Sequence, residues 1–143
     1  PNLLVPELVE AISRSQAPRL YICNLMTQPG ETDGLDVSGH LRAIESQLAS
    51  IGVQQRLFDA VLAQDALPPG PELDYYRSKG AEPVDCDLDG LREQGYRVML
   101  ASMQGPQQRS QGRDFKGTLR HDSRSLALAV MRFYRAKQKR QID

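Results

Sequence analysis

Three short runs of mostly apolar residues constrain the fold of this chain more than any other feature. They cover residues 20–23, 57–63 and 96–101, and each has the length of a β-strand. Strands that are buried on both faces of a parallel sheet have this nearly continuous apolar character. Segments with helical spacing separate the runs. The sequence therefore predicts an α/β fold, with a mostly parallel sheet covered by helices on both faces.

The expected helices follow from apolar residues that recur three or four positions apart. Residues 5–12 form one such segment, and residues 37–51 form a longer one that Asp36 or Ser38 would cap and Gly52 would stop. Shorter helices are expected at residues 72–78 and near Leu88 and Leu91, with residues 83–86 extended between them. A closing helix begins near Asp122 and ends in a basic tail. We find no internal repeat and no separate second domain, so residues 1–143 are expected to belong to a single domain.

Charge and cysteine content exclude several classes of function. The 18 basic and 18 acidic residues give a formal net charge of zero, whereas nucleic-acid binding usually requires a basic excess. Cys23 and Cys86 are too few for a disulfide framework, so we expect two reduced, buried thiols. No apolar run reaches the roughly 20 residues of a spanning helix, and no signal-peptide pattern opens the chain. We therefore expect a cytoplasmic protein that uses neither nucleic acid nor membrane.

The first residues of the chain run directly into an amphipathic segment. Pro1-Asn2-Leu3-Leu4 contains no initiator methionine. We therefore expect the chain to be the C-terminal portion of a larger domain, whose N-terminal half is its partner in the complete fold.

Three polar loops leave the carboxyl ends of the expected strands, where ligands of parallel sheets collect. They cover residues 24–34, 64–70 and 102–120. The first is the most specific, because Pro29 and two glycines shape its backbone while its other residues supply hydroxyl, amide and carboxylate groups. The helix after it would offer free N–H groups to an anion such as phosphate. The alternative is an ordinary capped βα loop.

The same stretch carries a family resemblance. Residues 21–34, YICNLMTQPGETDG, are followed by His40, Ala43 and Ile44, and further matches lie at residues 1–4, at Tyr76, at residues 80–84 and at residues 120–122. With these motifs the chain resembles the bacterial gluconeogenesis factor family (YvcK-type). That family is related to the archaeal phospholactate transferases, which build a deazaflavin cofactor. The resemblance covers nearly the whole chain, and residues 27–34 favour the gluconeogenesis-factor branch.

The resemblance implies a Rossmann-like, cytoplasmic protein linked to growth on gluconeogenic carbon sources, cell-wall precursor supply and cell shape. It also implies binding of a UDP-sugar such as UDP-N-acetylglucosamine. The glycine-rich phosphate loop of the complete family protein is not present in this chain. On this resemblance we expect no catalytic residue, and we expect ligand-binding residues at Thr27, Gln28, Gly30, Glu31, Thr32, Asp33, Tyr76, Arg120 and His121.

Each ligand residue has a physical rationale and an alternative. A tyrosine ring such as that of Tyr76 can cover a base or a sugar, although Tyr76 could simply pack, or Tyr75 could be the residue that faces the ligand. The guanidinium of Arg120 can pair with a diphosphate, or with Asp122 at the surface. His121 would reach a phosphate or help to cap the last helix, and we favour capping.

Other chemistry is weakly supported by the sequence. His40 is expected to pack rather than to act as a base, and no metal site is expected from the two histidines. Glu31 and Asp33 could share a Mg²⁺ ion with substrate phosphates. The glycine-rich residues 112–117 lack the lysine of a phosphate-binding P-loop. The basic tail favours a solvated helix end, with a partner surface as the alternative.

The sequence thus favours a regulatory protein that binds a nucleotide sugar, and it leaves open whether the protein also performs catalysis. The main alternative is a phospholactate-type transferase that moves a phosphorylated group from a nucleotide donor to a deazaflavin acceptor. A third alternative is that this segment mainly forms the interface of a homo-oligomer.

Overall fold

The computed structural model describes residues 2–67, 70–102 and 119–139. Its sheet contains β1 (Leu20–Ile22), β2 (Ala60–Gln64) and β3 (Val98–Ala101), in the order β1-β2-β3. Both pairs of neighbouring strands are parallel, with Tyr21 opposite Val61 and Leu62 opposite Met99. The predicted α/β class with a parallel sheet is therefore confirmed.

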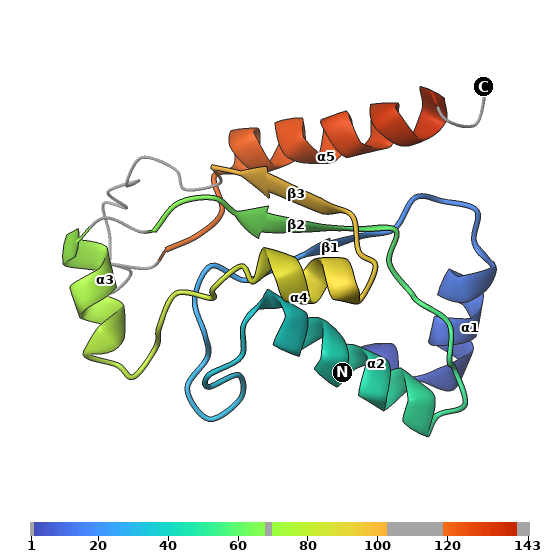
Figure 1. The fold of residues 1–143 in the computed structure, drawn as a ribbon, viewed down its shortest axis with the longest axis horizontal. Helices are drawn as coiled ribbons and strands as arrows, with labels where there is room; N and C mark the ends of the chain where they lie inside the picture. Colours follow the sequence, from blue (N-terminus) through green and yellow to red (C-terminus); the bar gives the residue numbers. More distant parts are fainter. Residues whose placement is uncertain (1, 68–69, 103–118, 140–143) are drawn as a thin grey trace, which may run out of the picture.

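Helices lie on both faces of this sheet and beyond one of its ends. They are η1 (Asn2–Leu4), α1 (Pro6–Arg14), α2 (Val37–Ser50), α3 (Gly70–Arg77), α4 (Leu88–Glu93) and α5 (Ser123–Lys139). Figure 1 shows α5 along one face and α2 with α4 along the other, while α3 lies beyond the carboxyl ends of the strands. None of the described helices is long and apolar enough to cross a membrane.

The alternation of side chains along each strand divides the core between the two faces. Toward α2 and α4, Cys23 and Val61 pack with Leu41 and Leu91. Toward α5, Leu62 packs with Ala129. The central strand β2 is buried at residues 60–63, as a parallel strand covered on both faces should be.

Several boundaries and burial predictions were wrong in detail. The run at 57–63 becomes a strand only from Ala60, because Leu57 packs with Val9 and Leu48 while the Asp59 carboxylate accepts the Arg19 N–H. Residues 83–86 were expected to be extended, and the structure agrees, with one isolated antiparallel bridge between Met26 and Pro83. Both cysteines are free, but only Cys23 is buried, since Cys86 is half-exposed. Residues 103–118, most of the predicted loop at 102–120, lie outside the described residues.

Candidate functional site

A hollow of about 290 Å³ opens at the carboxyl edge of the sheet. One segment that follows each strand lines it: residues 24–28 after β1, Tyr76 of α3 after β2, and residues 119–121 after β3. Ligands of open parallel sheets collect at this edge. The hollow therefore lies where the topology predicts a binding site.

Thr27 attaches the first segment to the chain that leaves α3. Its N–H donates to the Glu82 carbonyl at 2.7 Å, and its Oγ1 accepts the Glu82 N–H at 2.9 Å. Thr27 is only 7% exposed, so its hydroxyl supplies a hydrogen-bond partner to a backbone amide that has little access to water. Thr27 thus fixes the position of the first segment in the lining of the hollow.

Two further cross-links attach the third segment to the other two. The Leu119 N–H donates to the Tyr76 hydroxyl at 2.7 Å, and the His121 Nε2 lies 3.2 Å from the Cys23 carbonyl oxygen. A carbonyl only accepts, so this geometry requires a hydrogen on Nε2. Together with the Thr27–Glu82 pair, these contacts join the three segments around the hollow.

Two alternatives were left open by the sequence: whether Tyr75 or Tyr76 lines the hollow, and whether His121 caps the last helix. Tyr76 lines the hollow, whereas Tyr75 is 45% exposed and meets the Tyr76 ring edge-on, with centroids 5.7 Å apart. The cap of α5 is Asp122, whose carboxylate accepts the Ser125 N–H at 2.8 Å. Hydrogen bonds from the side chain and the N–H of Ser125 lower the pKa of Asp122. The favoured capping role of His121 was therefore wrong.

The remainder of the first loop folds onto itself rather than toward the hollow. The Thr32 hydroxyl accepts the Gln28 N–H at 2.8 Å, and the Asp33 carboxylate accepts the Gly30 N–H at 2.6 Å. Gly30 has a φ of +82°, which favours glycine. Of the predicted ligand residues, the hollow thus gathers Thr27, Gln28, Tyr76, Arg120 and His121, while Gly30, Glu31, Thr32 and Asp33 lie outside its lining.

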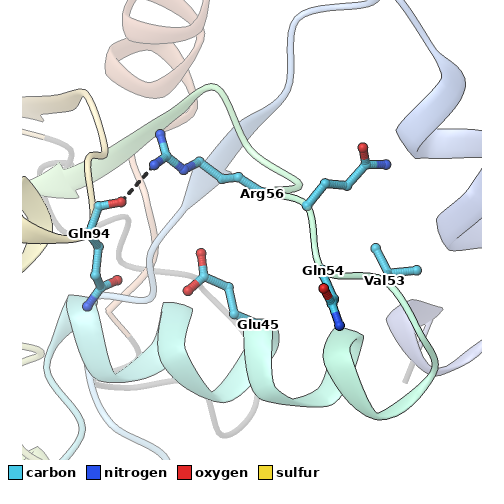
Figure 2. Close-up of a pocket in the computed structure, with 6 residues that line it drawn as sticks. Glu45, Val53, Gln54, Arg56 and Gln94 are labelled. Carbon is cyan, nitrogen blue, oxygen red and sulfur yellow. Dashed lines mark hydrogen bonds between the residues drawn. The ribbon is translucent and has the colours of Figure 1, made fainter.

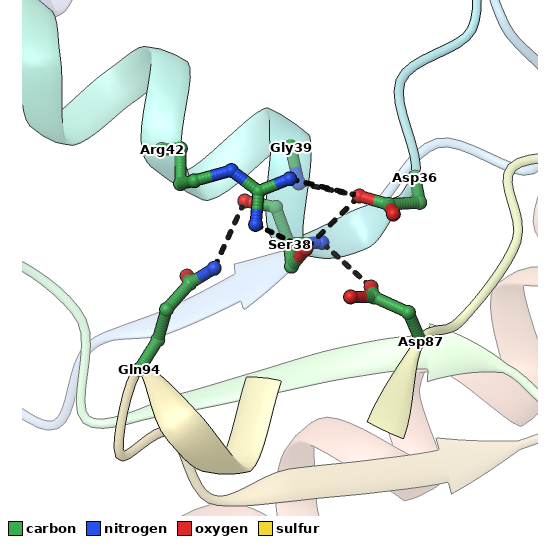
Figure 3. Close-up of polar contacts among 6 residues, drawn as sticks. All are labelled: Asp36, Ser38, Gly39, Arg42, Asp87 and Gln94. Carbon is green, nitrogen blue, oxygen red and sulfur yellow. Dashed lines mark hydrogen bonds and ion pairs between the residues drawn. The ribbon is translucent and has the colours of Figure 1, made fainter. Parts of the chain in front are cut away.

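The predicted anion site at the start of α2 was wrong. The Ser38 N–H donates to Asp87 Oδ1 at 3.1 Å, and the Gly39 N–H donates to Asp36 Oδ1 at 2.6 Å, as Figure 3 shows. The Val37 N–H donates to the Asp85 carbonyl at 2.9 Å. Two carboxylates and a carbonyl already occupy the helix N-terminus, so a phosphate would meet negative charge there.

The same cluster joins α2 to α4. Arg42 donates to the Ser38 hydroxyl at 2.8 Å and lies 3.7 Å from Asp36, while the Gln94 amide reaches the Ser38 carbonyl at 3.4 Å. Ser38 is fully buried. Asp87 was not predicted as part of this cluster, because its carboxylate accepts an N–H of α2 and makes no capping hydrogen bond to α4, the helix that it precedes.

A second hollow of about 290 Å³ lies at the amino edge of the sheet and is lined by Glu45, Val53, Gln54, Gln55, Arg56 and Gln94. Its charged groups already hold the fold together. Arg56 donates to the Gln94 carbonyl at 2.8 Å, as Figure 2 shows, and its guanidinium carbon lies 4.8 Å from the centre of the Tyr96 ring. The Tyr96 hydroxyl donates to Glu45 at 2.6 Å. This hollow is therefore the weaker candidate.

Metal ligands are not grouped within the part of the chain that the structure describes, where no three His, Cys, Asp or Glu side chains could hold one ion. Of the two carboxylates considered for Mg²⁺, Asp33 accepts the Gly30 N–H through one oxygen, and both Glu31 and Asp33 lie outside the lining of the hollow. His40 is buried, and its Nδ1 lies 3.1 Å from the Tyr21 hydroxyl. Burial lowers the pKa of His40, which indicates a neutral packing residue.

The fold and the hollow define a parallel α/β protein whose candidate ligand site lies at the carboxyl edge of its sheet. Comparison with known families gives the particular family. The chain belongs to the family described as "2-phospho-L-lactate transferase CofD", whose model matches residues 1–104.

Relatives with curated names carry a different description. The chain is 40% identical over 134 residues to a "Putative gluconeogenesis factor" of Nostoc sp., an alignment that covers 94% of this chain and 27% of the relative. It is 31% identical to the "Gluconeogenesis factor" of Bacillus subtilis, over 89% of this chain and 36% of the relative. The chain therefore spans between a quarter and two fifths of these relatives.

A solved structure supports the fold. The crystal structure of a member of the UPF0052 family from Bacillus halodurans matches with a TM-score of 0.76 and 31% identity. The match covers 90% of this chain and 37% of that one.

Proposed function

We propose that this chain forms one wall of a nucleotide-sugar site in a regulatory protein that links carbon metabolism to cell-wall precursor supply and cell shape. The ligand class is a UDP-sugar, such as UDP-N-acetylglucosamine. The observation that carries the proposal is the hollow at the carboxyl edge, which brings an arginine, a tyrosine ring and polar loop groups together from three separate segments.

The chemistry of the lining suits a nucleotide sugar. Arg120 offers a planar set of donors that matches a diphosphate, and Tyr76 offers a ring face for the base or the sugar. Gln28 adds an amide that can donate and accept. Leu25, Met26 and Leu119 supply the apolar surface that small-molecule sites usually contain.

The size of the hollow supports a shared site rather than a complete one. Its volume of about 290 Å³ is at the lower limit of ligand pockets, which hold roughly 300–1,000 Å³. A UDP-sugar would therefore extend past it. We assign the remaining wall to parts of the protein that correspond to the sections of the relatives beyond this match.

The names of the relatives favour regulation, whereas the family description favours catalysis. A phospholactate-type transferase, which would pass a phosphorylated group to a deazaflavin acceptor, is therefore the second candidate. Turnover of such an acceptor by the intact protein would support it. In the same assay, Mg²⁺ and a chelator would show whether the ligand's phosphates bind together with a metal ion.

Isothermal titration of UDP-N-acetylglucosamine into the intact protein, as it is made in the cell, tests the proposal. Because hydrogen bonds to charged groups are strong, Arg120→Ala should weaken binding by about one to two orders of magnitude. Arg132→Ala is the matched control, since Arg132 is an exposed arginine of α5 outside the lining of the hollow. Equal affinities for the two variants would contradict the role of Arg120.

A further inference from the structure

Tyr76 contributes to the hollow both with its ring and with its hydroxyl. Its half-buried side chain lines the hollow, while its hydroxyl accepts the Leu119 N–H at 2.7 Å. The second contact joins α3 to a backbone amide 43 positions further along the chain. A phenylalanine would preserve the ring and lose this contact.

The hydrogen bond lies directly beside Arg120. Leu119 precedes Arg120, and His121, which follows it, is anchored through its Nε2 to the Cys23 carbonyl oxygen at 3.2 Å. The backbone of Arg120 is therefore held from both sides, by α3 through Tyr76 and by the exit of β1 through His121. A guanidinium recognises a diphosphate only when its plane is correctly oriented, so the placement of this backbone matters.

We propose that the Tyr76 hydroxyl is a positioning group, which accepts the Leu119 N–H and thereby fixes the backbone that presents Arg120 to an anionic ligand. The inference rests on the proposed function. It assigns to the hydroxyl a role separate from any contact between the Tyr76 ring and the ligand.

The expected effect on affinity is moderate. Without the hydrogen bond, residues 119–120 must be ordered when the ligand binds, and the affinity falls by the contribution of one ordinary hydrogen bond. Tyr76→Phe should therefore weaken UDP-N-acetylglucosamine binding about three- to tenfold. Tyr75→Phe should leave the affinity unchanged, because Tyr75 is exposed and outside the lining.

Two measurements on the intact protein separate positioning from direct contact. The first is a double-mutant cycle in which Tyr76→Phe is combined with Arg120→Ala. A group that acts through Arg120 should have little further effect once Arg120 is removed. The second is hydrogen exchange of the Leu119 amide without ligand, which should accelerate in Tyr76→Phe while the amides of β2 keep the protection of the unaltered protein.

Each result of these two measurements either supports or overturns the inference. Unchanged affinity or unchanged Leu119 exchange in Tyr76→Phe would overturn it. An equal loss with and without Arg120 would also overturn it, because the hydroxyl would then act independently of Arg120. If Arg120→Ala weakens binding while Tyr76→Phe does not, the inference fails and the proposed function stands. Absence of binding by the unaltered protein would overturn both.

Discussion

The ammonium group of Lys137 lies 2.9 Å from the carboxylate of Asp59, although 78 positions separate the two residues in the chain. The same carboxylate accepts the Arg19 N–H at 2.8 Å. One half-buried side chain thus joins the entry to β1, the entry to β2 and the last turns of α5. This contact helps to hold α5 against the sheet, with its start beside the hollow.

Removing the charge at position 59 should destabilise the fold in a pH-dependent way. Burial opposes ionisation, but the hydrogen bonds from Arg19 and Lys137 and the charges of both residues outweigh it, so the pKa of Asp59 is lowered. A lowered pKa stabilises the folded state at pH values above the unfolded pKa of 3.8, and this contribution is lost as the pH falls through the folded value.

Asp59→Asn should therefore lower the free energy of unfolding by about 1–2 kcal/mol at pH 7. The difference from the unaltered protein should shrink below pH 4. Denaturant unfolding at pH 7 and pH 3 measures both quantities. Asp74→Asn, at an exposed position of α3, is the control and should have little effect at either pH. If Asp59→Asn is as stable as Asp74→Asn at pH 7, the carboxylate of Asp59 does not stabilise the fold.

Gly90 of α4 should be intolerant of any side chain. A Cβ atom there would lie 2.0 Å from Asp87 Oδ2 and 3.1 Å from the Ser38 hydroxyl, within the cluster that joins α2 to α4. Gly90→Ala should therefore displace Asp87 and destabilise the protein by about 1–3 kcal/mol, measured by thermal unfolding.

Gly70→Ala is the matched control for Gly90→Ala, because a Cβ at the first residue of α3 would meet no atom within 4 Å. Alanine also loses less backbone freedom than glycine on folding, so Gly70→Ala should be neutral or slightly stabilising. A larger loss for Gly70→Ala than for Gly90→Ala would show that the cluster is not the cause.

The parallel strands, the helices and the edge that carries the hollow could be predicted, because apolar periodicity and topology determine them. The run at 20–23 and the helix from Val37 are close to β1 and α2. Which of the polar groups within residues 27–33 line the hollow could not be predicted from the local sequence. The hydroxyls of Thr27 and Thr32 look alike in sequence, yet Thr27 pairs with Glu82 across 55 positions and Thr32 folds its own loop.

The anion site predicted at the start of α2 was wrong for the same reason, a contact between residues far apart in the chain. The helix N-terminus at Val37 is real, but Asp87 approaches it from 49 positions away and takes the Ser38 N–H. Asp36 caps the helix locally and is visible in the sequence pattern, whereas the carboxylate of Asp87 reaches the same N-terminus through tertiary packing and leaves no local signal. Long-range polar contacts, rather than secondary structure, were therefore the limit of the sequence analysis.

Acidification should destabilise the fold through His40. Burial lowers the pKa of this histidine below its ordinary value of 6.5, and its Nε2 has no hydrogen-bond partner among the described residues. The unfolded chain therefore takes up the proton first, and the stabilising contribution present above pH 6.5 is lost as the pH falls through the folded pKa.

Unfolding free energies measured from pH 7.5 to pH 5 should show this loss, and His40→Gln should reduce the slope, since glutamine does not titrate. A slope that persists in His40→Gln would assign the effect to another group.

Substitutions at Thr27 separate the stability that comes from its hydrogen bond from the stability that comes from its packing. Valine has nearly the volume of threonine but no acceptor, so Thr27→Val would leave the Glu82 N–H without its partner at 2.9 Å. This should destabilise the protein by about 1–3 kcal/mol, and the Glu82 amide should exchange faster. Thr27→Ser keeps the hydroxyl and loses a methyl group, which should destabilise the protein by about 1 kcal/mol. If serine is the more damaging substitution, then packing of the methyl group, rather than the hydrogen bond to Glu82, holds the first segment in place.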